Sequence, residues 1–312
     1  MPEQDSVRAA IRIGQQNLDE VLARRAAAQK TRAKALASHP RAQDVRLQSG
    51  GAFGVAPSIT AGFLVAAGDS WFDYPIHDVL KKLDEEHGYD IESAAHRGDP
   101  VEAMASENGQ LDKLARCFEK VAARGGNPKA VLLSGGGDDI AGKEFGMLLN
   151  NRTLPIGGWN AQVVSGVLNQ RITVAYQKMF WVATQMGMRY TGKKLPILIH
   201  GYDYPVPDGR GFWGGWPFPG PWLQPGFREK LFEDLNTTVT MMHQVMDQFN
   251  DTMIALTKFP ELGDVRYVDL RGTLSNDLKS DKYKQWWANE LHPTEDGFSA
   301  IANRFASTLS AL

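Results

Sequence analysis

Short apolar runs alternate with longer helical patterns along most of this chain, and that alternation restricts the fold more than any other feature. The strand-length apolar runs lie near residues 62–67, 89–95, 130–134, 196–200 and 265–270. The helical stretches lie near residues 76–86, 101–123, 160–188, 228–256 and 295–312. Alternation of this kind is typical of a mainly parallel sheet with helices on both faces. We therefore predict an α/β fold.

Three of the predicted strands end in glycine and polar residues. The first leads into Gly68-Asp69-Ser70, the second into His96-Arg97-Gly98-Asp99, and the third into Gly135-Gly136-Gly137-Asp138-Asp139. Ligands of parallel sheets bind at the carboxyl ends of strands, and glycines there let backbone N–H groups approach a ligand. Ser70 is thus a candidate nucleophile, although a serine at a strand end is more often a helix N-cap.

A second candidate lies far along the chain, at His292-Pro293-Thr294. Pro293 fixes its own backbone and biases His292 toward extended geometry, while Thr294 is predicted to cap the final helix. The imidazole should therefore lie on a rigid corner. A histidine beside tryptophans is also commonly a packing residue, and the residues alone leave both interpretations open.

These segments resemble the four blocks of the SGNH, or GDSL-type, hydrolases, in the order of that family. The blocks are Gly68-Asp69-Ser70, Gly98, Gly136-Gly137-Asp138-Asp139 and His292-Pro293. The resemblance implies a flavodoxin-like three-layer α/β/α sandwich, here with an N-terminal helical extension. It also implies a serine hydrolase that cleaves carboxylic esters through an acyl-enzyme on Ser70, with His292 as base and no cofactor.

Two positions depart from the family pattern. The resemblance places Gly98 and Asp138 in the oxyanion hole, but the family has asparagine at the second position, and an ionised Asp138 would repel the oxyanion. Asp138 could contribute if protonated; otherwise the N–H groups of Ser70 and Gly98 would form the hole. Asn289 stands where the family has the aspartate that orients the histidine; Glu290 and a backbone carbonyl are the alternative orienting groups.

The two exchanges keep a second function open, that of a catalytically impaired family member that binds carbohydrate or lipid. A third idea is metal-assisted hydrolysis by clustered carboxylates at Asp69, Asp73, Asp138 and Asp139. No metal-ligand spacing supports it, so we expect no metal site.

The segment 201–227 is rich in aromatic residues, glycine and proline. It follows a predicted strand, so it should lie on the same rim as Ser70, as a lid or wall for an apolar group; burial against the N-terminal segment is the equal alternative. Trp71, Trp213 and Trp216 are the predicted substrate-binding residues. A formal G-x-G-x-x-G match at residues 209–214 is discounted because prolines follow it.

Composition agrees with an ordinary enzyme that acts on a small-molecule ester. The 312 residues are 43% apolar and carry a net charge of −2, which gives no reason to expect nucleic-acid binding. The single cysteine, Cys117, excludes intrachain disulfides. No apolar run is long enough for stable membrane insertion and no signal peptide is visible, so we expect a cytoplasmic protein, with export left open.

Residues 1–48 form a basic segment of helical spacing, which Gly50-Gly51 and residues 54–57 are predicted to link to a hydrolase domain at 49–312. A solvated helix lying on that domain is the favoured interpretation. Contact with an acidic surface, a membrane or a second copy of the chain in a homo-oligomer is the alternative.

Overall fold

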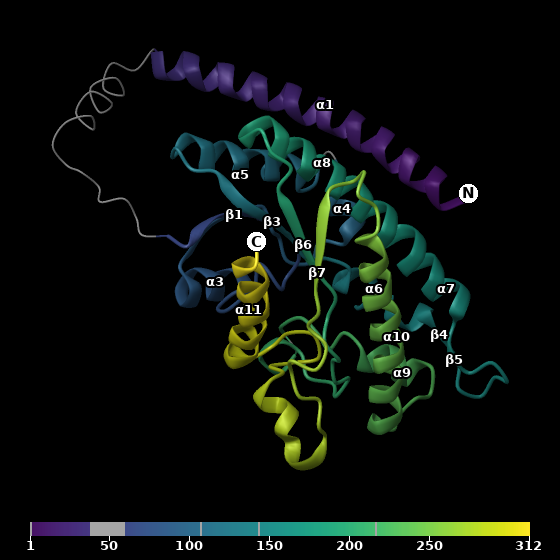
Figure 1. Ribbon diagram of the computed structural model, residues 1–312. Coiled ribbons are helices and arrows are strands. Elements are labelled where there is room, and N and C mark those ends of the chain that lie inside the picture. Colours follow the sequence, from purple (N-terminus) through teal and green to yellow (C-terminus); the bar gives the residue numbers. More distant parts are fainter. Residues whose placement is uncertain (1, 38–59, 107, 143, 216) are drawn as a thin grey trace.

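A computed structural model describes residues 2–37, 60–106, 108–142, 144–215 and 217–312 (Figure 1). Its centre is a parallel sheet with strand order β2-β1-β3-β6-β7. The strands are β1 (Gly62–Ala67), β2 (Tyr89–Ser93), β3 (Pro128–Leu133), β6 (Pro196–His200) and β7 (Asp264–Val268). This is the flavodoxin-like order, so the predicted α/β fold is confirmed.

Helices cover both faces of the sheet. On one face, α3 (Val79–His87) and α11 (Glu295–Ser310) pack against each other. On the other lie α5 (Leu111–Ala123), α8 (Thr173–Thr191) and α10 (Leu235–Leu256). The chain order changes direction between β1 and β3, and the loops after these two strands carry Ser70 and Asp138. Both residues therefore lie at the switch point where such sheets bind ligands.

Shorter elements connect these layers. They are α4 (Val101–Met104), α6 (Gly137–Ile140), η1 (Phe145–Leu148), β4 (Leu149–Asn150), β5 (Gly158–Trp159), α7 (Ala161–Ser165), η2 (Gly166–Ile172), η3 (Phe212–Gly214), α9 (Gln224–Glu229) and η4 (Lys279–Gln285). The short strands β4 and β5 form an antiparallel pair.

Two predicted helices are interrupted. The stretch 101–123 divides into α4 and α5, because Gly109 lies so close to the Ala103 carbonyl that a Cβ there would approach it to 1.9 Å. The stretch 228–256 divides into α9 and α10. Leu231 adopts a left-handed φ of 65°, and Asp234 caps a new helix by accepting a hydrogen bond from the Thr237 N–H at 2.8 Å.

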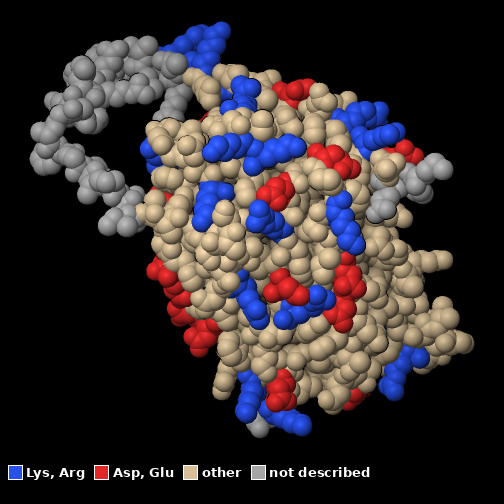
Figure 2. Space-filling model, in the orientation of Figure 1, with Lys and Arg blue, Asp and Glu red and all other residues tan. Residues whose placement is uncertain are grey.

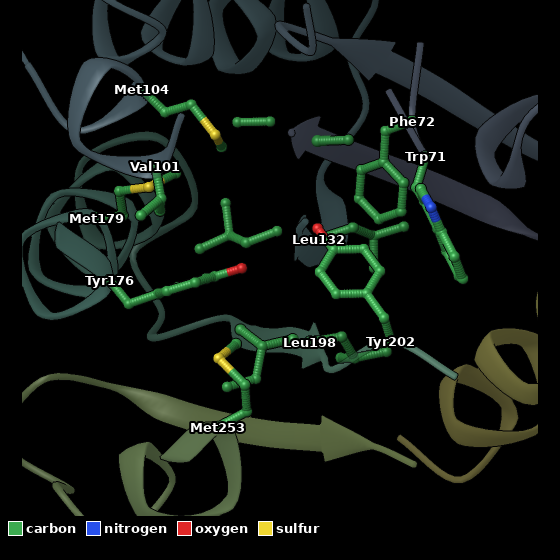
Figure 3. Close-up of a cluster of buried hydrophobic side chains, with 14 of the residues drawn as sticks. Trp71, Phe72, Val101, Met104, Leu132, Tyr176, Met179, Leu198, Tyr202 and Met253 are labelled. Atoms are coloured by element: carbon green, nitrogen blue, oxygen red, sulfur yellow. The ribbon is translucent and has the colours of Figure 1, made fainter. Parts of the chain in front are cut away.

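The core continues to the turn that carries Ser70. Trp71 and Phe72 follow β1, and their rings lie beside Tyr202 in the buried cluster of Figure 3. The ring centroids of Trp71 and Tyr202 are 4.9 Å apart. Packing on this side fixes the backbone next to Ser70 in one position.

The first helix, α1 (Pro2–Ala37), forms an additional layer outside α5 and α8 (Figure 1). Val7 and Val21 are buried in this contact, and Gly14 lets the helix approach the ring of Trp181, which a Cβ would meet at 2.9 Å. Arg25 forms an ion pair with Glu119 of α5 at 2.6 Å. The helix thus lies on the domain, while the predicted linker lies outside the described residues.

Charges of both signs are interspersed on the face shown in Figure 2. None of the helices within the described ranges is long and apolar enough to cross a membrane.

Candidate active site

Ser70 lies in a tight turn directly after β1. The Phe72 N–H donates a hydrogen bond to the Asp69 carbonyl at 3.1 Å and so closes the turn. Ser70 does not cap a helix, since Asp78 caps α3 instead by accepting a hydrogen bond from the Lys81 N–H at 2.8 Å. The Ser70 hydroxyl is therefore not used by the backbone of a helix.

His292 lies on a closed loop before α11. The Ala288 N–H donates to the His292 carbonyl at 2.9 Å, and the Thr294 N–H donates to the Trp286 carbonyl at 2.9 Å. Thr294 caps α11, as predicted, by accepting a hydrogen bond from the Gly297 N–H at 3.2 Å. These bonds fix the backbone on both sides of the imidazole.

One hydrogen bond ties the two segments together. The Trp71 indole Nε1–H donates to the Leu291 carbonyl at 3.0 Å, across 220 positions of sequence. The consequence is that Ser70 Oγ lies 2.8 Å from His292 Nε2. A hydroxyl and an imidazole at this distance are the pair that nucleophilic catalysis requires.

Asn289 contacts the other ring nitrogen of His292. Its Oδ1 accepts hydrogen bonds from the backbone N–H groups of Leu291 at 3.0 Å and His292 at 2.9 Å, and it lies 3.0 Å from His292 Nδ1. Two backbone donors require an acceptor, so they fix which way the amide points. His292 Nδ1 must then carry the ring proton, which leaves the lone pair of Nε2 facing Ser70.

Two aromatic rings enclose His292. Tyr74 stacks on the imidazole with centroids 4.3 Å apart, and its hydroxyl accepts a hydrogen bond from Asn289 Nδ2 at 3.0 Å. Trp222 meets the imidazole edge-on at 5.5 Å. This burial lowers the pKa of His292 to about 3, because it removes the water that would solvate the imidazolium. The ring is accordingly neutral at neutral pH.

Glu290, the alternative orienting group, points elsewhere. Its carboxylate accepts hydrogen bonds from the backbone N–H groups of Gly209 at 2.9 Å, Trp222 at 2.6 Å, Leu223 at 2.8 Å and Gln224 at 3.0 Å. Glu290 thus anchors the aromatic segment at two places, and Asn289 is the side chain that contacts His292 Nδ1 among the residues that the structure describes.

The loop that carries Gly98 is fixed to the turn that carries Ser70. The Gln110 side chain accepts a hydrogen bond from the Gly68 N–H at 2.8 Å, and its Nε2 donates to the Gly68 carbonyl at 2.8 Å and to Asp99 at 3.0 Å. Gly98 has a left-handed φ of 83°, with no atom within 4 Å of where a Cβ would lie. Gly98 and Ser70 line the same cavity.

Asp138 lies in the first turn of α6, after Gly136 with its positive φ of 104°. The Gly98 N–H faces its carboxylate and by itself lowers the pKa of Asp138. Burial raises the pKa of Asp138 to about 7, and the carboxylates of Asp69, Asp139 and Asp99 act in the same direction.

A cavity of about 280 Å³ opens beside the Ser70–His292 pair. The walls of this cavity, hereafter the Ser70 cavity, are Ser70, Tyr74, Pro75, Arg97, Gly98, Asp138, Phe212, Phe218, Pro219, Trp222, Leu291 and His292. The aromatic segment therefore contributes a wall, as one of its two interpretations predicts.

Trp71 and Trp213, two of the three tryptophans predicted to bind substrate, do not line the Ser70 cavity. Trp71 is buried in the core, because its ring packs against Tyr202 and its indole bonds to Leu291. Trp213 is 68% exposed and borders a neighbouring cavity. Trp216 lies outside the described residues. Trp222 is the tryptophan that lines the Ser70 cavity.

Comparison with solved structures finds proteins of related shape. A protein assigned as a GDSL-like lipase from Parabacteroides merdae is 13% identical, with TM-score 0.45, over 80% of this chain and 97% of its own. A protein assigned as an SGNH hydrolase from Slackia heliotrinireducens is 12% identical, with TM-score 0.46, over 80% and 100%. An acetylxylan esterase from Geobacillus stearothermophilus is 15% identical, with TM-score 0.43, over 80% and 94%. No protein-family model and no curated protein matches the chain.

At such low identity, the chemistry must be argued from the side chains of this chain. From the sequence, Tyr74 and Trp222 were associated only with a possible substrate wall and were not named as site residues, and Gln110 was assigned no role. The aromatic run after Ser70 was a visible signal for Tyr74. Gln110 has no such signal, because it lies 42 positions from Gly68.

The carboxylates considered for a metal site have other partners. Asp69 accepts hydrogen bonds from the Ser134 hydroxyl at 2.7 Å, from the Trp71 N–H at 3.0 Å and from the Tyr202 hydroxyl. Asp139 accepts from the Val101 N–H at 2.9 Å. Within the described part of the chain, no group of three or more His, Cys, Asp or Glu side chains could hold a metal ion.

Proposed function

We propose that this chain is a serine hydrolase that cleaves carboxylic esters through an acyl-enzyme on Ser70. The observation that supports this most is the continuous chain of contacts from Ser70 Oγ to His292 Nε2, and from His292 Nδ1 to Asn289 Oδ1. The Asn289 orientation gives the imidazole the tautomer that can accept the Ser70 proton.

The reaction follows from these contacts. His292 Nε2 takes the hydroxyl proton as Ser70 Oγ bonds to the ester carbonyl carbon, and the carbonyl oxygen becomes an oxyanion. The N–H groups of Ser70 and Gly98 are the proposed donors to that oxyanion. His292 then gives its proton to the leaving alcohol. Water, deprotonated by His292 in the same way, cleaves the acyl-enzyme.

The lining of the Ser70 cavity favours an ester with an apolar or aromatic group. Phe212, Phe218 and Trp222 present rings to the cavity, and Arg97 is the cation of its lining. Arg97 already donates to Asp73 at 3.3 Å, so it is only partly available to an anionic substrate. A neutral ester that buries a short acyl chain or an aryl group matches these walls.

Hydrolysis of p-nitrophenyl esters tests the proposal. Purified protein should release p-nitrophenol, and Ser70→Ala should lower kcat by a factor on the order of 10⁴ or more, because the serine and histidine act as a unit. Ser310→Ala, at the end of α11, serves as the matched serine control and should retain full activity. Equal hydrolysis by Ser70→Ala would remove the assignment.

The exchanged residues Asp138 and Asn289 motivate the alternative, a protein that binds carbohydrate or lipid without cleaving it. The same assay separates the two functions when it is combined with ligand binding. Saturable binding of an acylated sugar or a lipid, without Ser70-dependent hydrolysis, would favour the binding protein.

A further inference from the structure

Asp138 is a carboxyl group at a position where the proposed chemistry calls for a hydrogen-bond donor. It borders the Ser70 cavity together with Ser70, Gly98 and His292. One side of the carboxyl group faces the Gly98 N–H, and Oδ2 is buried with no hydrogen-bond partner among the described residues. A buried oxygen without a partner destabilises an ionised carboxylate much more than a neutral acid.

The charged groups around Asp138 also oppose its ionisation. Asp69 faces it from the turn after β1, Asp139 from its own helix α6, and Asp99 from the loop after β2. Asp203, from the segment after β6, borders the small cavity on the other side of Asp138. The two basic groups of the β2 loop have other partners, since Arg97 binds Asp73 and His96 Nδ1 lies 3.0 Å from Asp99. No ion pair found among the described residues includes Asp138.

We propose that Asp138 acts as a neutral carboxylic acid whose O–H donates a hydrogen bond to the oxyanion, so that the enzyme works in acid and stops when Asp138 ionises. This inference rests on the proposed ester hydrolysis. The protonated group supplies the donor that an asparagine amide would otherwise supply. The ionised group accepts the Gly98 N–H and places a negative charge where the oxyanion must form.

Asp138 transfers no proton in this scheme. The Ser70 proton moves to His292 as the Oγ–carbon bond forms, and it leaves with the alcohol when the carbon–oxygen bond of the ester breaks. The Asp138 proton stays on the carboxyl group throughout. The hydrogen bond from the Asp138 O–H to the carbonyl oxygen of the ester becomes shorter as negative charge develops on that oxygen. The N–H groups of Gly98 and Ser70 donate to the oxyanion beside the Asp138 O–H.

The direction of the pH dependence follows from two groups. His292, with its pKa lowered to about 3, is a free base above that value. Asp138, with its pKa raised to about 7, is protonated below that value. The value of kcat/KM should therefore be high between these limits and fall tenfold per pH unit well above 7, to about a hundredfold loss at pH 9.

The test is the pH profile of kcat/KM for the wild type, Asp138→Asn and Asp139→Asn. Asp138→Asn keeps a donor of the same shape that does not titrate, so the loss above pH 7 should disappear. Asp139→Asn is the matched control: it removes one of the charges that raise the pKa of Asp138, so the loss should remain but begin at lower pH. A wild-type profile that rises to pH 9, or an unchanged alkaline loss in Asp138→Asn, would overturn the inference.

A second measurement does not depend on turnover. In wild-type protein labelled with ¹³C at aspartate carboxyl carbons, the Asp138 signal is the one that disappears in Asp138→Asn. At pH 5.5 the chemical shift of this signal should be that of a neutral carboxylic acid. A signal that shows an ionised carboxylate there would also overturn the inference. The absence of Ser70-dependent hydrolysis at every pH would instead refute the proposed function, and the donor role with it.

Discussion

Asn289 orients the His292 ring but places no negative charge beside it. The Oδ1 atom of Asn289 is held by two backbone N–H groups, so the imidazole tautomer is fixed as firmly as a carboxylate would fix it. The imidazolium of the proposed reaction gains no ion pair from Asn289, however, and the pKa of His292 is lowered by burial alone. The site combines the correct tautomer with a weak base.

Substitution of Asn289 separates these two properties. Asn289→Asp keeps the acceptor and adds a charge, so it should raise the pKa of His292, move the acid limb of the pH profile upward and increase kcat. Asn289→Leu removes the acceptor and should lower kcat on the order of 10³-fold to 10⁴-fold, as loss of the tautomer does in serine proteases. The readout is kcat across pH 4 to 9; equal activity of all three proteins would contradict the role of Asn289.

For single residues, the sequence indicated which side chains are candidates better than it indicated what those side chains contact. Ser70 and His292 became candidates because the segments that carry them resemble two of the four family blocks, and the structure places their side chains 2.8 Å apart. The orientation of Asn289 could not be predicted, because it depends on two backbone N–H groups whose direction is set by the closed loop around His292. Trp71 was placed at the substrate because it adjoins Ser70, but its indole turns into the core to bond Leu291.

Among the elements, the aromatic segment depends on one buried carboxylate. Glu290 collects four backbone N–H groups from both ends of the segment, around Gly209 and around Trp222 to Gln224. Because Glu290 is adjacent to Asn289, the wall of the Ser70 cavity is attached to the loop that carries His292.

Removal of the charge on Glu290 should loosen that wall. Glu290→Gln places an amide N–H₂ against backbone donors, and we expect it to destabilise the protein by about 3 kcal/mol. The value of KM for an aryl ester should rise more than kcat falls, since the wall binds substrate and Asn289 remains in place. Glu229→Gln, whose carboxylate forms an exposed ion pair with Lys230, is the control. Urea unfolding and steady-state kinetics measure both effects, and wild-type stability of Glu290→Gln would contradict the anchor.

The three central strands β1, β3 and β6 were predictable because they are nearly continuous apolar runs that are mostly buried, such as Val131 to Leu133. The edge strands β2 and β7 carry charged residues and are only partly buried. The breaks within the two predicted helices 101–123 and 228–256 were not predictable, because the helical spacing of apolar residues continues across them. The close approach of Gly109 to the Ala103 carbonyl and the left-handed backbone of Leu231 are backbone features that the apolar spacing does not encode.

Over the whole molecule, α1 is a layer added to a complete sandwich. Its apolar spacing predicted a helix, but the surface it covers depends on α5 and α8, which the spacing does not describe. Its contact lies on helices outside the sheet, whereas Ser70 follows the carboxyl end of β1 and His292 lies 2.8 Å from Ser70. Stability and catalysis should therefore be separable at this interface.

Val21→Asp tests that separation. Burying an unpaired carboxylate in the fully covered position of Val21 should cost about 3 kcal/mol, or release the helix from the domain. The midpoint of thermal unfolding should fall by several degrees, while kcat/KM at 25 °C stays near that of the wild type. Gln16→Asp, on the exposed side of the same helix, should change neither quantity. A parallel loss of kcat/KM in folded Val21→Asp protein would show that α1 supports the site.

The most direct measurement is covalent labelling by a fluorophosphonate, followed by mass spectrometry of the labelled peptide. Its phosphorus reacts much faster with a serine whose proton is taken by a neighbouring base than with an ordinary hydroxyl group. The adduct should map to Ser70, and it should be absent from Ser70→Ala and strongly slowed in His292→Ala. An unlabelled wild-type protein, or an adduct on another residue, would contradict the pairing of hydroxyl and imidazole on which the proposed chemistry depends.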